Sequence, residues 1–250
     1  MKKTTSILTL ALLTICATQA QDININPATT DEGVIINGIK WATRNLAAHG
    51  KFVEKPEDYG ALFQWGRAGD GHEQHTSPNY PTNDTYFENG IISNVENFDV
   101  NGQIVNTHAA YGKFIKQAHN SSNWRVPQDD ALWNSGSETT PIKTVNDPCP
   151  EGWRLPTQTE FITLGNGEQA DTPVVGYCFG NGDNLLFLPA AGYRYYGNGA
   201  LYFKGEDGYY WSSTPIGTYA HYLFFYSNDV NPNVNPHRAF GFSVRCVAEH

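Results

Sequence analysis

Six Asn-Gly dipeptides divide this chain of 250 residues into short segments. They begin at Asn37, Asn89, Asn101, Asn166, Asn181 and Asn198. Asn followed by Gly fits the positive φ angles of the tight turns that join antiparallel strands. The segments between the later dipeptides are short and rich in aromatic and β-branched residues, as strands are. We therefore expect strands at 172–179, 184–188, 200–203, 209–212, 219–225 and 240–247.

A helix signal stands between these hairpins and the first half of the chain. Thr157 and Glu160 have the spacing of a capping box, and Pro156 precedes them. A second short helix is expected over residues 109–119. No long linker or charge run divides the chain, so we expect a single domain over residues 38–250, preceded by an N-terminal segment at 21–37.

Residues 1–20 have the pattern of an export signal. Two lysines follow the first residue, an apolar run occupies 7–17, and small residues end at Ala20, after which we predict cleavage. Cys16 leaves a lipoprotein alternative open, but Ile15 stands where the lipid-attachment motif needs a small residue. The apolar run is too short to span a bilayer. We therefore expect an exported protein in the periplasm, at the outer cell surface or secreted.

Charge and motifs exclude several function classes. The net charge of −9 argues against a nucleic-acid-binding surface, which needs a basic face. His72 and His75 are one residue too close for the zinc-protease signature, and we interpret them as a solvated pair in a loop. No nucleotide-binding loop and no nucleophile elbow is present. We therefore predict no catalytic residue, no metal ligand and no cofactor.

The three cysteines that remain after signal removal are Cys149, Cys178 and Cys246. Export places them where disulfides persist, and an odd number allows at most one pair within the chain. We favour a bridge from Cys149, in a rigid Pro-rich segment, to Cys246, in a final strand. Cys178 lies in an apolar segment with no basic neighbour and is expected to be a buried, reduced thiol.

Six ordered motifs extend over residues 38–247. They read GIKWATRNL at 38–46, DYGALFQWGR at 58–67, NDPCPEGWRLPT at 146–157, LPAAGYR at 188–194, GYYWSS at 208–213 and GFSVRCV at 241–247. This ordered set resembles the Fibrobacter succinogenes major paralogous domain family, which is common in exported proteins of Bacteroidetes. The resemblance implies an α+β, C-type-lectin-like domain whose ends meet, with a structural disulfide from Cys149 to Cys246.

That fold is shared with formylglycine-generating enzymes and phage receptor-binding proteins. The tripeptides of calcium lectins are absent here, so the resemblance implies a fold and not calcium-dependent sugar binding. We interpret the motif blocks as structural, because their tryptophans, arginines and prolines suit the anchoring of loops. A functional site is therefore expected between the blocks.

The stretch over residues 213–238 fits this expectation. Its Tyr, Asn, Ser and His side chains are those that adaptable binding loops use. We predict contacts there with a macromolecular surface ligand, either a protein or a glycan, through Ser213, Thr214, Tyr219, His221, Tyr222, Phe224, Tyr226, Asn228, Asn231, Asn233, Asn235 and His237.

The sequence thus predicts an exported, adhesin-like binding domain that is not an enzyme. Some lectin-fold relatives are targets of diversity-generating retroelements, whose adenine mutagenesis enriches Asn and Tyr, and the pattern here is compatible with such a target. Two alternatives stay open. One is a secreted enzyme related to the formylglycine-generating type, and the other is a structural component of the cell surface or matrix.

Overall fold

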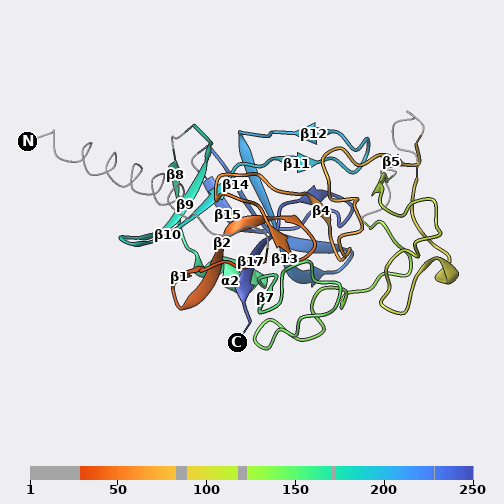
Figure 1. Cartoon of the computed structure of the whole chain (residues 1–250), viewed down its shortest axis with the longest axis horizontal. Helices are drawn as coiled ribbons and strands as arrows, with labels where there is room; N and C mark the ends of the chain where they lie inside the picture. Colours follow the sequence, from red (N-terminus) through yellow and green to blue (C-terminus); the bar gives the residue numbers. More distant parts are fainter. Residues whose placement is uncertain (1–28, 83–88, 118–122, 171–172, 228, 250) are drawn as a thin grey trace, which may run out of the picture.

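The computed structural model describes residues 29–82, 89–117, 123–170, 173–227 and 229–249. The predictions for residues 1–20 and for Asn228 lie outside the described residues. Of the described residues, 39% are in strands and 4% in helix, and most of the strands form small antiparallel sheets (Figure 1). The expected α+β, C-type-lectin-like class is therefore wrong, because the fold is nearly all β.

The predicted helices account for this error. The helix α2 covers only Gln158–Thr163. Of the helix expected at 109–119, the described residues form turns followed by the short strand β6, Phe114–Ile115. Glycines interrupt both regions, at Gly112 and Gly165, and both adopt positive φ angles that end a helical run.

The central sheet joins the beginning and the end of the described chain. It contains β1 (Val34–Ile36), β2 (Ile39–Ala48), β17 (Arg245–Ala248) and β7 (Trp153–Arg154), in that order, with β3 (Lys51–Phe52) paired to β2. The turn between β1 and β2 is the first Asn-Gly dipeptide, in which Asn37 and Gly38 both have positive φ angles, of 49° and 87°.

The other strands form four further small sheets among the described residues. One contains β8 (Glu168–Ala170), β9 (Gly176–Asn181) and β10 (Asn184–Pro189). The second contains β12 (Leu201–Tyr202), β11 (Tyr193–Arg194), β16 (Gly241–Phe242) and β4 (Phe63–Gln64). The third contains β13 (Asp207–Ile216), β14 (Tyr219–Tyr226) and β15 (Asp229–Val234). A parallel pair joins β5 (Asn79–Tyr80) to β6.

In Figure 1 the β9–β10 hairpin projects at one end of the molecule, and the turn-rich residues 89–117 lie at the other. The latter segment contains a 3-10 turn, η1, at Val95–Asn97. Four Asn-Gly dipeptides lie in turns between antiparallel partners, namely those at Asn37, Asn101, Asn181 and Asn198. Those at Asn89 and Asn166 do not, because they precede an extended segment and follow α2 respectively.

The predicted capping box is confirmed at the start of α2. The Thr157 side chain accepts a hydrogen bond from the Glu160 backbone, and the Glu160 carboxylate accepts one from the Thr157 backbone. Arg154 donates two hydrogen bonds to the two oxygens of the same carboxylate, at 2.8 and 2.6 Å. This bidentate pair fixes α2 against β7, so a helix of little intrinsic stability is held by its first turn.

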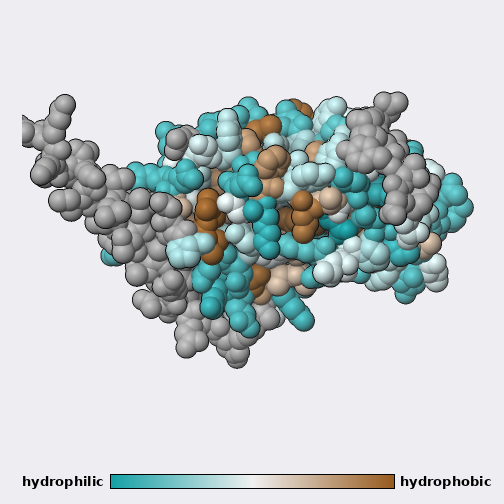
Figure 2. Space-filling model, turned by 90° about the horizontal axis from the view of Figure 1, so that it is seen from above, coloured by the Kyte–Doolittle hydropathy of each residue, from teal (hydrophilic) through white to brown (hydrophobic). Residues whose placement is uncertain are grey.

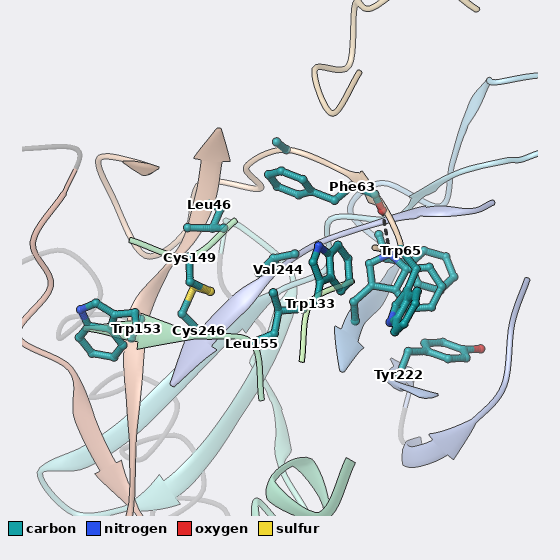
Figure 3. Close-up of a cluster of buried hydrophobic side chains, with 14 of the residues drawn as sticks. Leu46, Phe63, Trp65, Trp133, Cys149, Trp153, Leu155, Tyr222, Val244 and Cys246 are labelled. Carbon is teal, nitrogen blue, oxygen red and sulfur yellow. Dashed lines mark hydrogen bonds between the residues drawn. A yellow bond between two sulfur atoms is a disulfide. The ribbon is translucent and has the colours of Figure 1, made fainter. Parts of the chain in front are cut away.

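The predicted disulfide between Cys149 and Cys246 is also confirmed, and it joins residues 97 positions apart. It attaches the segment before β7 to β17, close to Trp153 and Leu46 (Figure 3). Cys178 is buried as predicted. The prediction of a reduced thiol is wrong, because Cys178 is disulfide-bonded and the described residues contain no free cysteine.

Tryptophans connect the sheets through their ring N–H groups. Trp211 on β13 donates to the carbonyl of Phe63 on β4 at 2.7 Å, and Trp65 donates back to the carbonyl of Ser212 at 2.9 Å. Trp124 in turn donates to the carbonyl of Trp65. Figure 3 shows Trp65 and Phe63 within the main hydrophobic core. These buried rings satisfy carbonyls that irregular segments would otherwise leave without donors.

Candidate functional site

Aromatic rings form a continuous network of contacts across the sheets that contain β11 and β14. We call this network, part buried and part exposed, the aromatic belt. Each of its rings lies within 6.5 Å of another, measured between ring centroids. Its members are Tyr193, Tyr195, Tyr196, Tyr202, Phe203, Tyr209, Tyr219, Tyr222, Phe224, Tyr226, His237, Phe240 and Phe242.

Side chains along β13 and β14 alternate between the two faces of the sheet, and this places one half of the belt on a single face. Tyr209 lies directly opposite Phe224, and their ring centroids are 4.9 Å apart. Phe224 stacks on Tyr226, two residues further along the same strand face, at 5.2 Å. Phe225, between them, points to the other face and is buried in a separate core cluster. The period of two therefore separates the belt from the core of this sheet.

Tyr193 on β11 joins this half to the other. Its ring lies 4.9 Å from Tyr209 and 5.7 Å from Tyr202, measured between centroids. Phe240, which precedes β16, contacts Tyr193 on one side and Tyr196 on the other. Beyond Tyr196 the belt continues through His237 to Tyr219, so it passes from one end of β14 to the other.

The rings of the belt differ in the fraction of each side chain that is exposed to solvent. Tyr226, Phe203, Tyr219 and Tyr202 are 45%, 46%, 39% and 37% exposed. Tyr222, by contrast, is only 8% exposed. Buried rings thus support exposed rings at the margins. Figure 2 shows a side of the molecule on which hydrophobic patches interrupt a largely hydrophilic surface.

Two belt phenols are held in the neutral form. Burial and, to a smaller extent, Tyr193 raise the pKa of Tyr222 to about 12. Burial also raises the pKa of Tyr209, whose hydroxyl donates to Asp207 Oδ2 at 3.0 Å. Both phenols therefore stay uncharged at neutral pH among the rings of the belt.

The structure divides the predicted site residues into three groups. Tyr219, Phe224, Tyr226 and His237 belong to the accessible part of the belt. Asn231, Asn233 and Asn235 are exposed on β15 or directly after it. Ser213, His221 and Tyr222 are buried, contrary to the expected surface position. Thr214 is half-buried.

A bulge explains the buried polar residues. Pairing of β13 with β14 shifts between Trp211 and Pro215, and Ser213 and His221 lie in this irregular part. Thr214 accepts from the backbone N–H of Gln158 and donates to a Glu138 carboxylate. The polar residues there consequently fix α2 and its surroundings to the sheet.

Sequence reasoning missed eight of the thirteen belt rings. Tyr193, Tyr209 and Phe242 belong to motif blocks that we interpreted as structural, and Phe240 directly precedes one. Tyr195, Tyr196, Tyr202 and Phe203 lie between two blocks. The available signal was the density of aromatic residues over 193–210, in which apolar rings greatly outnumber the aliphatic side chains of an ordinary core.

Asp70, His72 and Glu73 form an acidic cluster whose candidate ligand atoms lie within 4.8 Å of one another. His72 is fully buried, so its interpretation as a solvated loop residue is wrong. Its Nδ1 contacts Asp70 at 2.6 Å, and its Nε2 accepts from the backbone N–H of Gln64 at 3.1 Å. Arg67 donates to the other Asp70 oxygen. These partners occupy the ring nitrogens and the Asp70 oxygens, so the cluster fits a structural role.

An open cleft of about 850 Å³ lies beside the disulfide. Burial raises the pKa of Asp147 in its wall to about 7, opposed first by Lys143. The Asp147 carboxylate accepts from the backbone N–H groups of Cys149 and Leu155. Lys143 donates to carbonyls of the same segment, including Cys149. Asp147 and Lys143 therefore hold the loop around the disulfide.

The comparisons with known proteins match one part of the chain. A family model described as "Domain of unknown function (DUF8237)" matches residues 180–247. No curated protein and no solved structure matches the chain. Within the described ranges, no helix combines the length and apolar character that crossing a membrane requires. The matched span contains every ring of the aromatic belt, so the belt lies within a unit that the family model describes.

Proposed function

We propose that this chain is an exported, surface-associated binding domain of the adhesin type, and that the aromatic belt is its binding face. One observation carries the proposal. Four large rings at the margins of the belt are more than a third exposed, although each is continuous with rings packed inside it. An apolar surface of this kind on a soluble fold marks an interaction site more often than it marks a chance exposure.

The belt is suited to binding because it is rigid before a ligand arrives. Tyr226 rests on Phe224, and Tyr202 rests on Tyr193 with an interplanar angle of 24°. Rings that are already positioned lose little conformational entropy when they are covered. Tyrosine also combines a large apolar area with a hydroxyl, which is why it is enriched in the residues that dominate binding energies.

Other features agree with export and with binding rather than catalysis. The Cys149–Cys246 bridge suits an oxidising compartment. The described residues contain no free cysteine, so nothing there favours the alternative related to formylglycine-generating enzymes. We retain the resemblance to the Fibrobacter succinogenes major paralogous domain family as part of this proposal, because exported proteins are what it implies.

The test is a binding screen against immobilised glycans and bacterial surface proteins, with and without a chelator. Tyr226→Ala and Tyr202→Ala should each weaken binding by about 1 to 3 kcal/mol. Tyr111→Ala is the matched control, because Tyr111 is 43% exposed and belongs to no ring contact of the belt. Loss of binding in the control alone, or equal binding by all variants, would place the binding face elsewhere.

A further inference from the structure

A tyrosine and two carboxylates stand in one row across the three strands β13, β14 and β15. Tyr226 pairs directly with Asp207 on one side and with Asp229 on the other. Directly opposed residues of antiparallel strands place their side chains on the same face, about 5 Å apart at Cβ. The Tyr226 ring is therefore flanked by an acid on each side.

This row faces outward. The neighbouring positions Phe225 and Val230 pack against the core on the other face of the sheet. Tyr226 is 45% exposed, and Asp229 is exposed as well. Asp207 is half-buried and is fixed by the hydroxyl of Tyr209. The Asp207 carboxylate is thus positioned by the belt, whereas the Asp229 carboxylate is open to solvent.

No cation of the described chain neutralises this row. The salt bridges among the described residues involve neither Asp207 nor Asp229. Lys204, the nearest lysine along the chain, lies 5.0 Å over the ring of Tyr59 instead. Glu206 adds a further exposed carboxylate next to Asp207. The chain as a whole carries a net charge of −9, which reinforces the local negative potential.

We propose that the ligand of the aromatic belt is a basic protein segment, with a Lys or Arg side chain lying on Tyr226 between Asp207 and Asp229. This inference rests on the proposed function and specifies its partner. A cation over an aromatic face is attracted by the electrons of the ring, and carboxylates on both sides add charge complementarity. Phe224, Tyr209 and Tyr193, which continue from Tyr226, then receive the apolar residues of the same segment.

The charges favour this partner over a glycan. A neutral sugar can stack on Tyr226 and donate its hydroxyls to the carboxylates, but it brings no positive charge to them and so gains less than a cation does. A sulfated or uronic glycan would be repelled by them. A guanidinium satisfies both requirements together, because its plane stacks on a ring while its N–H groups donate to carboxylates.

The experiment is a titration calorimetry series on the full chain with four probes. The probes are hexa-arginine, hexa-lysine, an uncharged Gly-Ser hexapeptide and cellohexaose. The variants are Tyr226→Ala, Asp229→Asn, and Asp207→Asn combined with Asp229→Asn. The matched charge control combines Glu151→Gln with Glu168→Gln, two exposed acids outside the belt. Thermal melting of each variant checks that it folds, and Asp229→Asn alone remains informative if the double variant does not.

We expect hexa-arginine to bind, and Tyr226→Ala to weaken it about tenfold. The double Asn variant should weaken it at least as much, whereas the charge control should change it less than about twofold because exposed charges at a distance are screened. Equal weakening by the control, or no binding of either basic peptide, overturns the inference. Binding of cellohexaose that depends on Tyr226 overturns the basic partner but keeps the proposed function. Failure of every probe, together with a negative binding screen, defeats both.

Discussion

Arg245 donates two hydrogen bonds to the side-chain oxygen of Asn45, which stands 200 positions earlier, at 2.9 and 2.7 Å. Both side chains are fully buried. Asn45 passes the network on by donating to the carbonyl of Tyr59 and the hydroxyl of Tyr210. Burial lowers the pKa of Arg245 to about 10, so the guanidinium stays charged at neutral pH. Four distant segments of the chain thus meet at one polar network.

Arg245→Lys should accordingly destabilise the protein by about 3 to 5 kcal/mol. A lysine cannot reproduce the several donors of the planar guanidinium, so Asn45 and two backbone carbonyls lose their donors. Urea unfolding followed by tryptophan fluorescence measures the effect. Lys51→Arg, at an exposed position, is the control and should change stability by less than about 0.5 kcal/mol. A loss below about 1 kcal/mol for Arg245→Lys would show that the network contributes little.

Removal of the Cys149–Cys246 bridge should cost about 2 to 5 kcal/mol, because it closes a loop of 97 residues in the unfolded chain. Cys149→Ser, Cys246→Ser and the double variant should be similar in stability, since either change breaks the same bond. Peptide mapping without reductant checks the pairing. A bridge from Cys149 or Cys246 to any other cysteine would contradict the structure.

Two tyrosines of the belt should respond in opposite ways to truncation. Tyr222→Ala removes a ring that is 8% exposed and packed against Phe242, so it should cost about 3 to 5 kcal/mol of stability. Tyr226→Ala should cost less than about 1 kcal/mol while it weakens binding. Thermal unfolding and binding are measured on the same preparations. A Tyr222→Ala variant as stable as the unchanged protein would mean that Tyr222 belongs to the exposed edge of the belt and not to its buried part.

Acid stability should depend on Asp70. Burial alone would raise the pKa of this carboxyl, but Arg67 and His72 hold it well below the ordinary value of 3.8. The unfolded chain therefore takes up a proton near that pH while the folded chain does not. The stabilisation is present above about pH 4 and is lost as the pH falls.

Asp70→Asn should therefore lower stability at pH 7 and flatten its decline below about pH 4, by on the order of 1 to 3 kcal/mol. Urea midpoints between pH 7 and pH 2.5 measure this, with Glu151→Gln as an exposed control. An unchanged acid slope in Asp70→Asn would assign the acid response to other carboxyls.

Local chemistry was sufficient to predict some elements before the structure was known. Thr157 and Glu160 interact within one turn, so their spacing alone specifies the capping box. Asn37-Gly38 likewise carries its own turn geometry. The pairing of Cys149 with Cys246 was favoured because one stands in a rigid Pro-rich segment and the other in a final strand, and the family resemblance implies the same bridge.

Other elements depend on partners that the sequence does not display. The segment of β15 resembles a loop because it contains Pro232, yet proline is tolerated there because β15 pairs with β14 alone, as an edge strand of its sheet. Tyr222 and Tyr226 are equivalent in the sequence pattern of β14, and packing against rings of other strands, such as Trp211 and Phe242, buries the first. The α+β expectation came from resemblance, and no periodicity in the chain supported long helices.

The disulfide has a mechanical consequence when the two ends of the chain are pulled apart. Such a pull enters through residues before Cys149 and leaves through residues after Cys246, and the covalent bridge carries it past the loop between the two cysteines, which are 97 positions apart. Every ring of the aromatic belt lies inside that loop. Tension between the two ends of the chain therefore cannot extend the belt, and the pairing of β2 with the last residues of β17, where Val247 lies opposite Trp41, bears the shear instead.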